Sequence, residues 1–180
     1  MQAGKRAFSM LWILLFLVFP GAAAAETGKP RELSWDDLIP PEGTPLPEPV
    51  KPIESRASTA RQRPSTGSGS PFSHLYPYNP VMSLNGQYVK LPGYVVPLES
   101  DAGGLLSEFL LVPYYGACIH VPPPPSNQIV YVRLNKPYLL KSMEDPVWIT
   151  GTITTQLWTN DAADSDYVMA GDRVEKFPVN

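Results

Sequence analysis

Short apolar runs separated by turn residues fill the second half of the chain, and this pattern indicates the class of fold. The runs are rich in Val, Ile, Leu and aromatic residues, which is typical of β-strands. Asn85–Gly86 and the DAGG stretch at 101–104 predict turns between them. The pattern therefore predicts a mainly β domain over residues 79–180. Its predicted strands cover residues 87–99, 108–114, 127–134, 147–155 and 167–177.

The order of the predicted elements indicates a particular architecture. Pro92–Gly93 interrupts the first run, and such a pair suits a bulge or a sharp bend. Leu139 and Met143, four residues apart within 136–146, indicate one short helix. Three strands, a short helix and two strands match a small OB-like, five-stranded Greek-key barrel. A five-stranded sandwich or an open roll would give the same pattern.

The first 25 residues predict a secretory signal peptide. Lys5 and Arg6 form a positive start, an apolar run follows, and Ala23–Ala25 gives a small-residue cleavage site. The apolar run is shorter than the about 20 residues of a membrane span, so the mature chain is predicted to have no transmembrane segment. No cysteine lies at the junction to carry a lipid. We therefore expect an exported, periplasmic protein that is soluble after cleavage.

Two further segments precede the β domain. Residues 26–42 predict a short docking segment, because Ser34 can cap a single helical turn whose apolar side chains need a surface to cover. Docking on the chain's own domain is the expected outcome, and capture by a partner is the alternative. Residues 43–78 lose all periodicity and are rich in Pro and Ser, which predicts a flexible, disordered linker.

Charge and motif content exclude several classes of function. Removal of Lys5 and Arg6 leaves 12 basic against 17 acidic residues, so neither nucleic acid nor an anionic membrane surface is an expected partner. The chain contains no nucleophile elbow, zinc-protease motif or dinucleotide fingerprint, and we expect a protein that is not an enzyme. The acidic stretch at 160–166 lacks the glycine and closing glutamate of a calcium loop and predicts a solvated turn.

The segment YYGACIHVPPPPSNQ holds the only cysteine, two residues before a histidine. Side chains two apart on an extended backbone share a face, so Cys118 and His120 can lean toward one ion. Thiolate and imidazole suit zinc or copper(I). Zinc needs three or four protein ligands, and Glu108, which begins the preceding strand, is the preferred internal third ligand. Other candidates are Glu99, Asp101, His74 or a group from another molecule.

Other interpretations of the cysteine remain open. Cys118 can be a small buried residue in a tight turn, with His120 bonded to a carbonyl group. Redox chemistry lacks a resolving cysteine, and a nucleophilic cysteine needs its base closer than an extended strand places His120.

The prolines after the motif predict a stiff polyproline II rod that ends the strand. Such a rod orders the motif, or it forms an edge that another protein recognises. The residues of this predicted partner edge are Tyr114, Tyr115, Pro122, Pro123, Pro124, Pro125 and Asn127.

Several strings carry a family resemblance. YVKLPGYVVPLE, EFLLVPYYGACIHVPPPPSNQIVYV and DPVWITGTI, with SWDDLIP upstream, resemble the DUF3299 family of exported bacterial proteins. The resemblance covers residues 31–41 and 83–172 and implies a small exported β domain without an established activity. Because similar proteins accompany zinc-responsive ABC-type transport systems, it also implies metal handling with an envelope or ABC-transporter partner.

These observations lead to two functional hypotheses. The first is a periplasmic accessory protein of zinc transport or homeostasis that binds a soft cation through Cys118 and His120. The second is an interaction module of an envelope ABC-transporter complex, in which Cys118 is structural and no metal binds.

Overall fold

The computed structural model of the chain describes residues 28–47, 53–54, 77–100, 103–117, 123–160 and 163–178. Its helical elements are single 3-10 turns, η1 (Trp35–Leu38), η3 (Met82–Leu84) and η4 (Ser126–Gln128). Its strands are β1 (Arg31–Glu32), β2 (Ile53–Glu54), β3 (Gln87–Ser100), β4 (Leu105–Val112), β5 (Val130–Leu139), β6 (Val147–Thr154), β7 (Trp158–Thr159), β8 (Asp164–Ser165) and β9 (Tyr167–Lys176).

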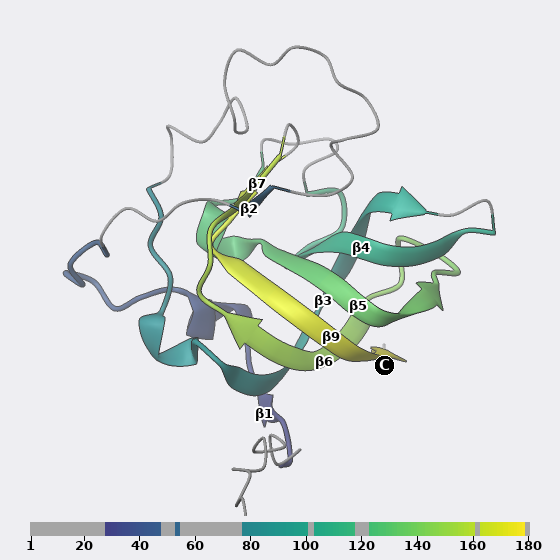
Figure 1. Cartoon of the computed structure of the whole chain (residues 1–180), viewed down its shortest axis with the longest axis horizontal. Helices are drawn as coiled ribbons and strands as arrows, with labels where there is room; N and C mark the ends of the chain where they lie inside the picture. The colour runs from purple at the N-terminus through teal and green to yellow at the C-terminus, as the bar shows by residue number, and fades with distance from the viewer. Residues whose placement is uncertain are drawn as a thin grey trace, which may run out of the picture.

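Five of these strands close into a barrel (Figure 1). β3 pairs with β4, β4 with β5, β5 with β9 and β9 with β6, and β6 returns to β3. All these pairs are antiparallel except β5–β9, which is parallel. This neighbour order is that of an OB-type Greek-key barrel, so the predicted mainly β, five-stranded architecture is confirmed. β1 adds one more strand, parallel to β3.

The short helix predicted over residues 136–146 is wrong, because β5 continues through this region to Leu139. Leu139 pairs with Leu105 on β4, and bends connect it to β6. The side chains of Leu139 and Met143 are 51% and 44% exposed, so their four-residue spacing does not mark a buried helical face. Ladder pairing with β4 therefore decides the local structure.

The predicted bend at Pro92–Gly93 falls where β3 changes partner. β3 pairs with β6 through Gly93 and with β4 from Tyr94 onward. A Cβ atom on Gly93 would lie 2.8 Å from both the Leu111 Cγ atom and the Val112 carbonyl oxygen. The strand crosses between its two partners at a residue without a side chain, because the backbones approach too closely for one.

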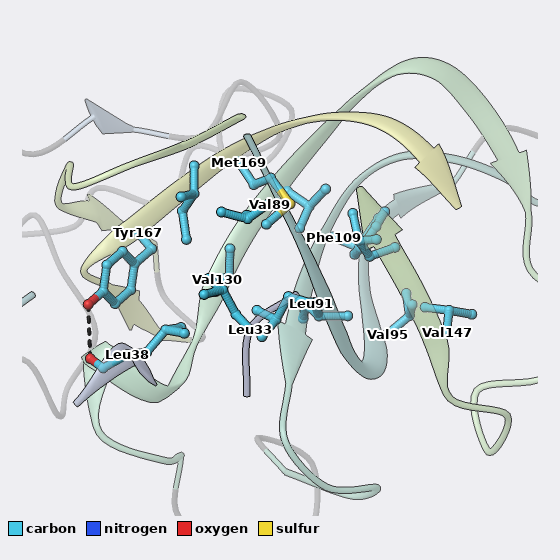
Figure 2. Close-up of a cluster of buried hydrophobic side chains, with 14 of the residues drawn as sticks. Leu33, Leu38, Val89, Leu91, Val95, Phe109, Val130, Val147, Tyr167 and Met169 are labelled. Carbon is cyan, nitrogen blue, oxygen red and sulfur yellow. Dashed lines mark hydrogen bonds between the residues drawn. The ribbon is translucent and has the colours of Figure 1, made fainter. Parts of the chain in front are cut away.

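Alternate residues of the barrel strands fill the interior and form one apolar cluster, the interior cluster (Figure 2). On β4, for example, Phe109 and Leu111 face inward and are buried. Apolar burial of this kind is the main stabilising contribution to the fold. The buried members are Leu33, Leu38, Leu84, Val89, Leu91, Val95, Leu106, Phe109, Leu111, Val130, Val132, Leu134, Val147, Ile149, Ile153, Tyr167 and Met169.

The segment before the barrel packs against it through η1. Ser34 donates hydrogen bonds from its backbone N–H and its hydroxyl to the Asp37 carboxylate, at 2.8 and 2.7 Å, and these bonds lower the pKa of Asp37. The Trp35 indole N–H donates to the Pro92 carbonyl at 2.8 Å. Leu38 is fully buried in the interior cluster, and its carbonyl accepts a hydrogen bond from Tyr167 (Figure 2).

The predicted signal peptide, residues 1–25, and most of the predicted linker, residues 43–78, are not among the described residues. Inside that linker, β2 pairs in parallel with β7. Among the described residues, no helix has the length and apolar character needed to cross a membrane.

Candidate functional site

The Cys-x-His motif begins immediately after a well-packed turn. Cys118, His120 and Pro122 lie outside the described residues, whereas Ala117 is described and fully buried. The Ala117 N–H donates to the Tyr114 carbonyl at 3.5 Å. Gly116 has a φ angle of 84°, in the left-handed region that favours glycine. The chain therefore enters the motif from a tight turn that is anchored by packing.

Ala117 belongs to a second buried cluster, on the outer face of β4 and β5. On β4, Leu110 and Val112 lie on the face opposite to the interior residues, and they join this cluster. Tyr131 of β5 stacks on Trp158 of β7, with ring centroids 4.5 Å apart and planes at 9°. We call this set the outer cluster; its members are Leu110, Val112, Ala117, Ile129, Tyr131, Trp158 and Ala163.

Glu108, the predicted third metal ligand, lies beside the outer cluster and is already engaged. Its Oε1 atom accepts a hydrogen bond from Arg133 Nε at 3.2 Å. An Arg133 terminal nitrogen donates to the Tyr131 hydroxyl at 3.1 Å, and that hydroxyl in turn bonds to Glu108. Burial, and next the bond to Glu108, raise the pKa of Tyr131 to about 12. The three side chains form a closed polar group at the edge of the cluster.

This arrangement limits what Glu108 can do as a ligand. Arg133 neutralises the carboxylate, so a cation must share Glu108 with Arg133 or displace it. Within the described residues, no group of three or more His, Cys, Asp or Glu side chains lies together as a metal site. Of the other candidate ligands, His74 and Asp101 lie outside the described residues, as does the Glu99 side chain.

The predicted partner edge divides into an exposed part and a packed part. Tyr114 and Tyr115 are 46% and 49% exposed. Pro124, in contrast, is buried between the half-buried Pro123 and the exposed Pro125. The Asn127 side-chain amide donates to the Asn79 carbonyl at 3.5 Å, within the protein. Among the described residues of the edge, the two tyrosines and Pro125 are therefore the exposed ones.

A groove that the sequence did not indicate lies next to Tyr115. The Tyr115 ring lies 6.2 Å from the Tyr94 ring, and its hydroxyl lies 3.5 Å from the Glu144 carboxylate. Tyr94 and Phe177 line the groove, which has a volume of about 710 Å³. The remaining lining residues are Glu144, Asp145, Pro146, Lys176 and Pro178. Tyr94 and Phe177 are distant in sequence, and only the meeting of β3, β6 and β9 brings them together.

The prediction of a solvated turn at 160–166 is wrong for Asp166, whose side chain is fully buried. Its Oδ2 atom accepts a hydrogen bond from the Asn79 N–H at 2.8 Å, and its own N–H donates to the Ser126 carbonyl at 2.9 Å. Burial is the main cause that raises the pKa of Asp166 to about 6, and the charge of Asp164 raises it as well. The hydrogen bonds from Asn79 and the Ser126 side chain act in the opposite direction and lower it. Among the described residues, neither Asp166 Oδ1 nor Asn79 Oδ1 has a hydrogen-bond partner.

Comparison with known proteins identifies the family of the chain and solved structures that resemble it. The family described as protein of unknown function DUF3299 matches residues 35–176. The crystal structure of a DUF3299 family protein from Pseudomonas aeruginosa PAO1 is 42% identical to the chain, with a TM-score of 0.64. The similarity covers 85% of this chain and 99% of that one. No curated protein matches the chain.

Proposed function

The chain belongs to the DUF3299 family, and from this premise we propose that it is a periplasmic accessory protein of a metal transport or homeostasis system. In this proposal Cys118 and His120 bind a soft cation, zinc in the first place, and the protein is not an enzyme. Its partner is an envelope protein, such as a component of an ABC transporter.

One observation supports the proposal above the others: the packing of Ala117. Ala117 directly precedes Cys118 and is buried in the same cluster as Tyr131, whose hydroxyl bonds to Glu108 and Arg133. The start of the motif is thereby attached to the outer face that also carries a nearly buried carboxylate. Cysteine, histidine and carboxylate together make a donor set that zinc accepts.

The ion pair between Arg133 and Glu108 favours weak metal binding at the proposed site, which suits the transfer of a metal to a partner. A cation that recruits Glu108 has to compete with a guanidinium group 3.2 Å from the same carboxylate. Competition of this kind lowers affinity, and an incomplete ligand set leaves coordination positions for a partner's ligands. Both properties suit a protein that passes a metal on rather than one that stores it.

Zinc titration under reducing conditions, in competition with a chromophoric chelator, tests the proposal. We expect Cys118→Ser and His120→Ala each to weaken zinc binding by at least about tenfold, because each removes a direct ligand. Glu42→Gln, at an exposed carboxylate that is not among the candidate ligands, is the control and should bind zinc as the wild type does. Wild-type affinity in both motif variants would refute the metal function.

Glu108 has a separate test. Glu108→Gln keeps the size of the side chain but removes its charge, so we expect zinc binding to weaken by about tenfold, as it does when supporting carboxylates of metal sites are lost. Thermal unfolding of the metal-free variant reports how far the fold itself is disturbed. Zinc affinity equal to that of the wild type would remove Glu108 from the proposed ligand set.

The second candidate function is a protein-interaction module. The exposed tyrosines of the predicted partner edge favour it. Tyr114 and Tyr115 are exposed beside an aromatic-lined groove, and exposed aromatic residues are frequent hot spots of protein interfaces. If this function is correct, Tyr114→Ala with Tyr115→Ala abolishes cross-linking to the transporter complex, whereas Cys118→Ser leaves it unchanged. The opposite pattern would contradict the module and favour a metal-dependent contact.

A further inference from the structure

A basic cavity lies on the outer wall of the barrel, where the residues preceding β1 approach β3, β6 and β9. Its volume is about 440 Å³, within the range of small-molecule sites. Lys29, Lys90 and Arg173 line it, together with Tyr88, Thr150 and Glu175. None of these residues belongs to the Cys-x-His motif or to the predicted partner edge. The cavity is therefore separate from both candidate sites described above.

Strand register builds the wall of this cavity. Lys90 of β3 is the direct neighbour of Thr150 on β6, and Thr150 is the direct neighbour of Arg173 on β9. The two cationic residues therefore flank one central threonine on three adjacent strands. Side chains directly opposite each other on paired strands lie within contact range. The barrel thus fixes the spacing of the two backbone positions that carry the cations.

Neighbouring side chains contact both cationic residues of the cavity wall. Lys90 Nζ lies 3.2 Å from Glu175 Oε2 and 4.9 Å from the centroid of the Trp148 ring. Arg173 lies 3.9 Å from Glu175 Oε1. Glu175 therefore bridges the two cations, one at each oxygen. The Lys90 side chain is 22% exposed and so is the more restrained of the two, whereas the Arg173 side chain is 71% exposed and can adjust to a ligand.

Charge indicates the chemical class of the ligand. Lys29, Lys90 and Arg173 oppose the single carboxylate of Glu175, which leaves an excess of positive charge in the cavity. The chain as a whole carries a formal net charge of −3, so the sign of the charge in the cavity is opposite to that of the whole chain. Thr150, which is buried, and Tyr88 add hydroxyl donors.

We propose that this cavity binds an oxyanion, the carboxylate or phosphate group of a small ligand. The guanidinium group of Arg173 offers paired N–H donors that match either group, and Lys90 supplies a point charge. The hydroxyl groups of Thr150 and Tyr88 complete the donor set. Binding relieves the repulsion among the cations that Glu175 alone does not balance. The site acts independently of Cys118 and of the metal function.

Isothermal titration of the purified protein with inorganic phosphate and, separately, with acetate tests the proposal, at an ionic strength held constant with sodium chloride. We expect saturable binding of at least one anion, and the preferred anion identifies a phosphate-bearing or a carboxylate-bearing ligand. Arg173→Gln should weaken this binding by about tenfold, because one charge-assisted contact is lost. Lys136→Gln, which removes an exposed cation of β5, is the control and should bind as the wild type does.

Glu175→Gln provides the opposite test. Removal of the competing carboxylate should strengthen anion binding by several-fold, an effect that a merely structural role of Glu175 would not produce. Absence of binding above the chloride background for both anions would overturn the proposal. So would equal affinity in the wild type, Arg173→Gln and Lys29→Gln.

Discussion

The interior cluster and the outer cluster are both closed to solvent, but they differ in polar content. Among the buried interior residues, Tyr167 alone has a polar side-chain group, and its hydroxyl is used twice. It donates to the Leu38 carbonyl at 2.9 Å and accepts from the Val81 N–H at 2.6 Å. The outer cluster contains Tyr131 and Trp158, and the Trp158 indole N–H is buried without a hydrogen-bond partner in the described part of the chain.

This difference separates what the two clusters contribute. The Tyr131 hydroxyl and the Trp158 indole N–H give the outer cluster two polar side-chain groups, whereas the interior cluster has one, the Tyr167 hydroxyl. Burial inside the barrel therefore secures the fold, while the outer face retains polar groups directly beside the entry to the Cys-x-His motif.

The largest expected effect comes from a matched pair of substitutions on β4. Leu111 faces the interior and Leu110 faces the outer cluster, and both are fully buried. We expect Leu111→Ala to lower the free energy of unfolding by about 4 kcal/mol and Leu110→Ala by about 2–3 kcal/mol, because the short β7–β8 cover can relax into the space left by Leu110. Urea unfolding of both variants measures the difference. Equal losses would remove the distinction between the two clusters.

The second prediction concerns Asp166, which belongs to neither cluster. Burial raises its pKa from 3.8 to about 6, so the folded chain holds this proton more tightly than the unfolded chain does. Its contribution to stability is therefore full below about pH 4 and declines as the pH rises through about 6. Asp166→Asn should remove this decline and stabilise the protein at pH 8 by on the order of 2 kcal/mol.

Thermal unfolding between pH 4 and pH 8 measures this effect. Ser126→Ala is a useful companion variant, because loss of a bond that lowers the pKa of Asp166 should move the decline to higher pH. A wild-type stability that does not fall between pH 4 and pH 8 more than that of Asp166→Asn would contradict the prediction.

The smallest expected effect comes from Arg133, at the solvent edge of the outer cluster. Arg133→Gln leaves the Glu108 carboxylate without its cation, but the Arg133 side chain is 46% exposed, so solvent screening reduces the loss. We expect about 1 kcal/mol in urea unfolding, with a smaller loss in the double variant Arg133→Gln, Glu108→Gln. A double variant less stable than the single one would show that the pair is not coupled in this way.

Local chemistry was sufficient to predict the five barrel strands, but not the short strands β1, β2, β7 and β8. Alternating apolar residues and the Asn85–Gly86 turn mark β3, and Gly86 has the left-handed φ of 78° that such a turn requires. The two errors arise from pairing between distant segments. Leu139 lies in a strand because β4 is its neighbour, and Asp166 is buried because its backbone pairs with Ser126.

The candidate sites show the same limit. The Cys-x-His motif is contiguous, so the sequence alone singles it out. The aromatic groove depends on Tyr94 and Phe177, and the basic cavity depends on Lys90 and Arg173; each pair becomes close only through the pairing of β3 with β6 and of β6 with β9. Neither pair has a sequence spacing that could indicate contact, because the register of three strands sets the distance.

The hydrogen bond from Tyr167 to Leu38 joins residues 129 positions apart. Leu33 and Leu38 are parts of the interior cluster, although they lie far before β3 in the sequence. The barrel thus binds a segment of its own chain in its core. A proteolytic nick within residues 55–76 would turn one polypeptide into a two-piece complex that these contacts hold together, so the fold is suited to fragment complementation.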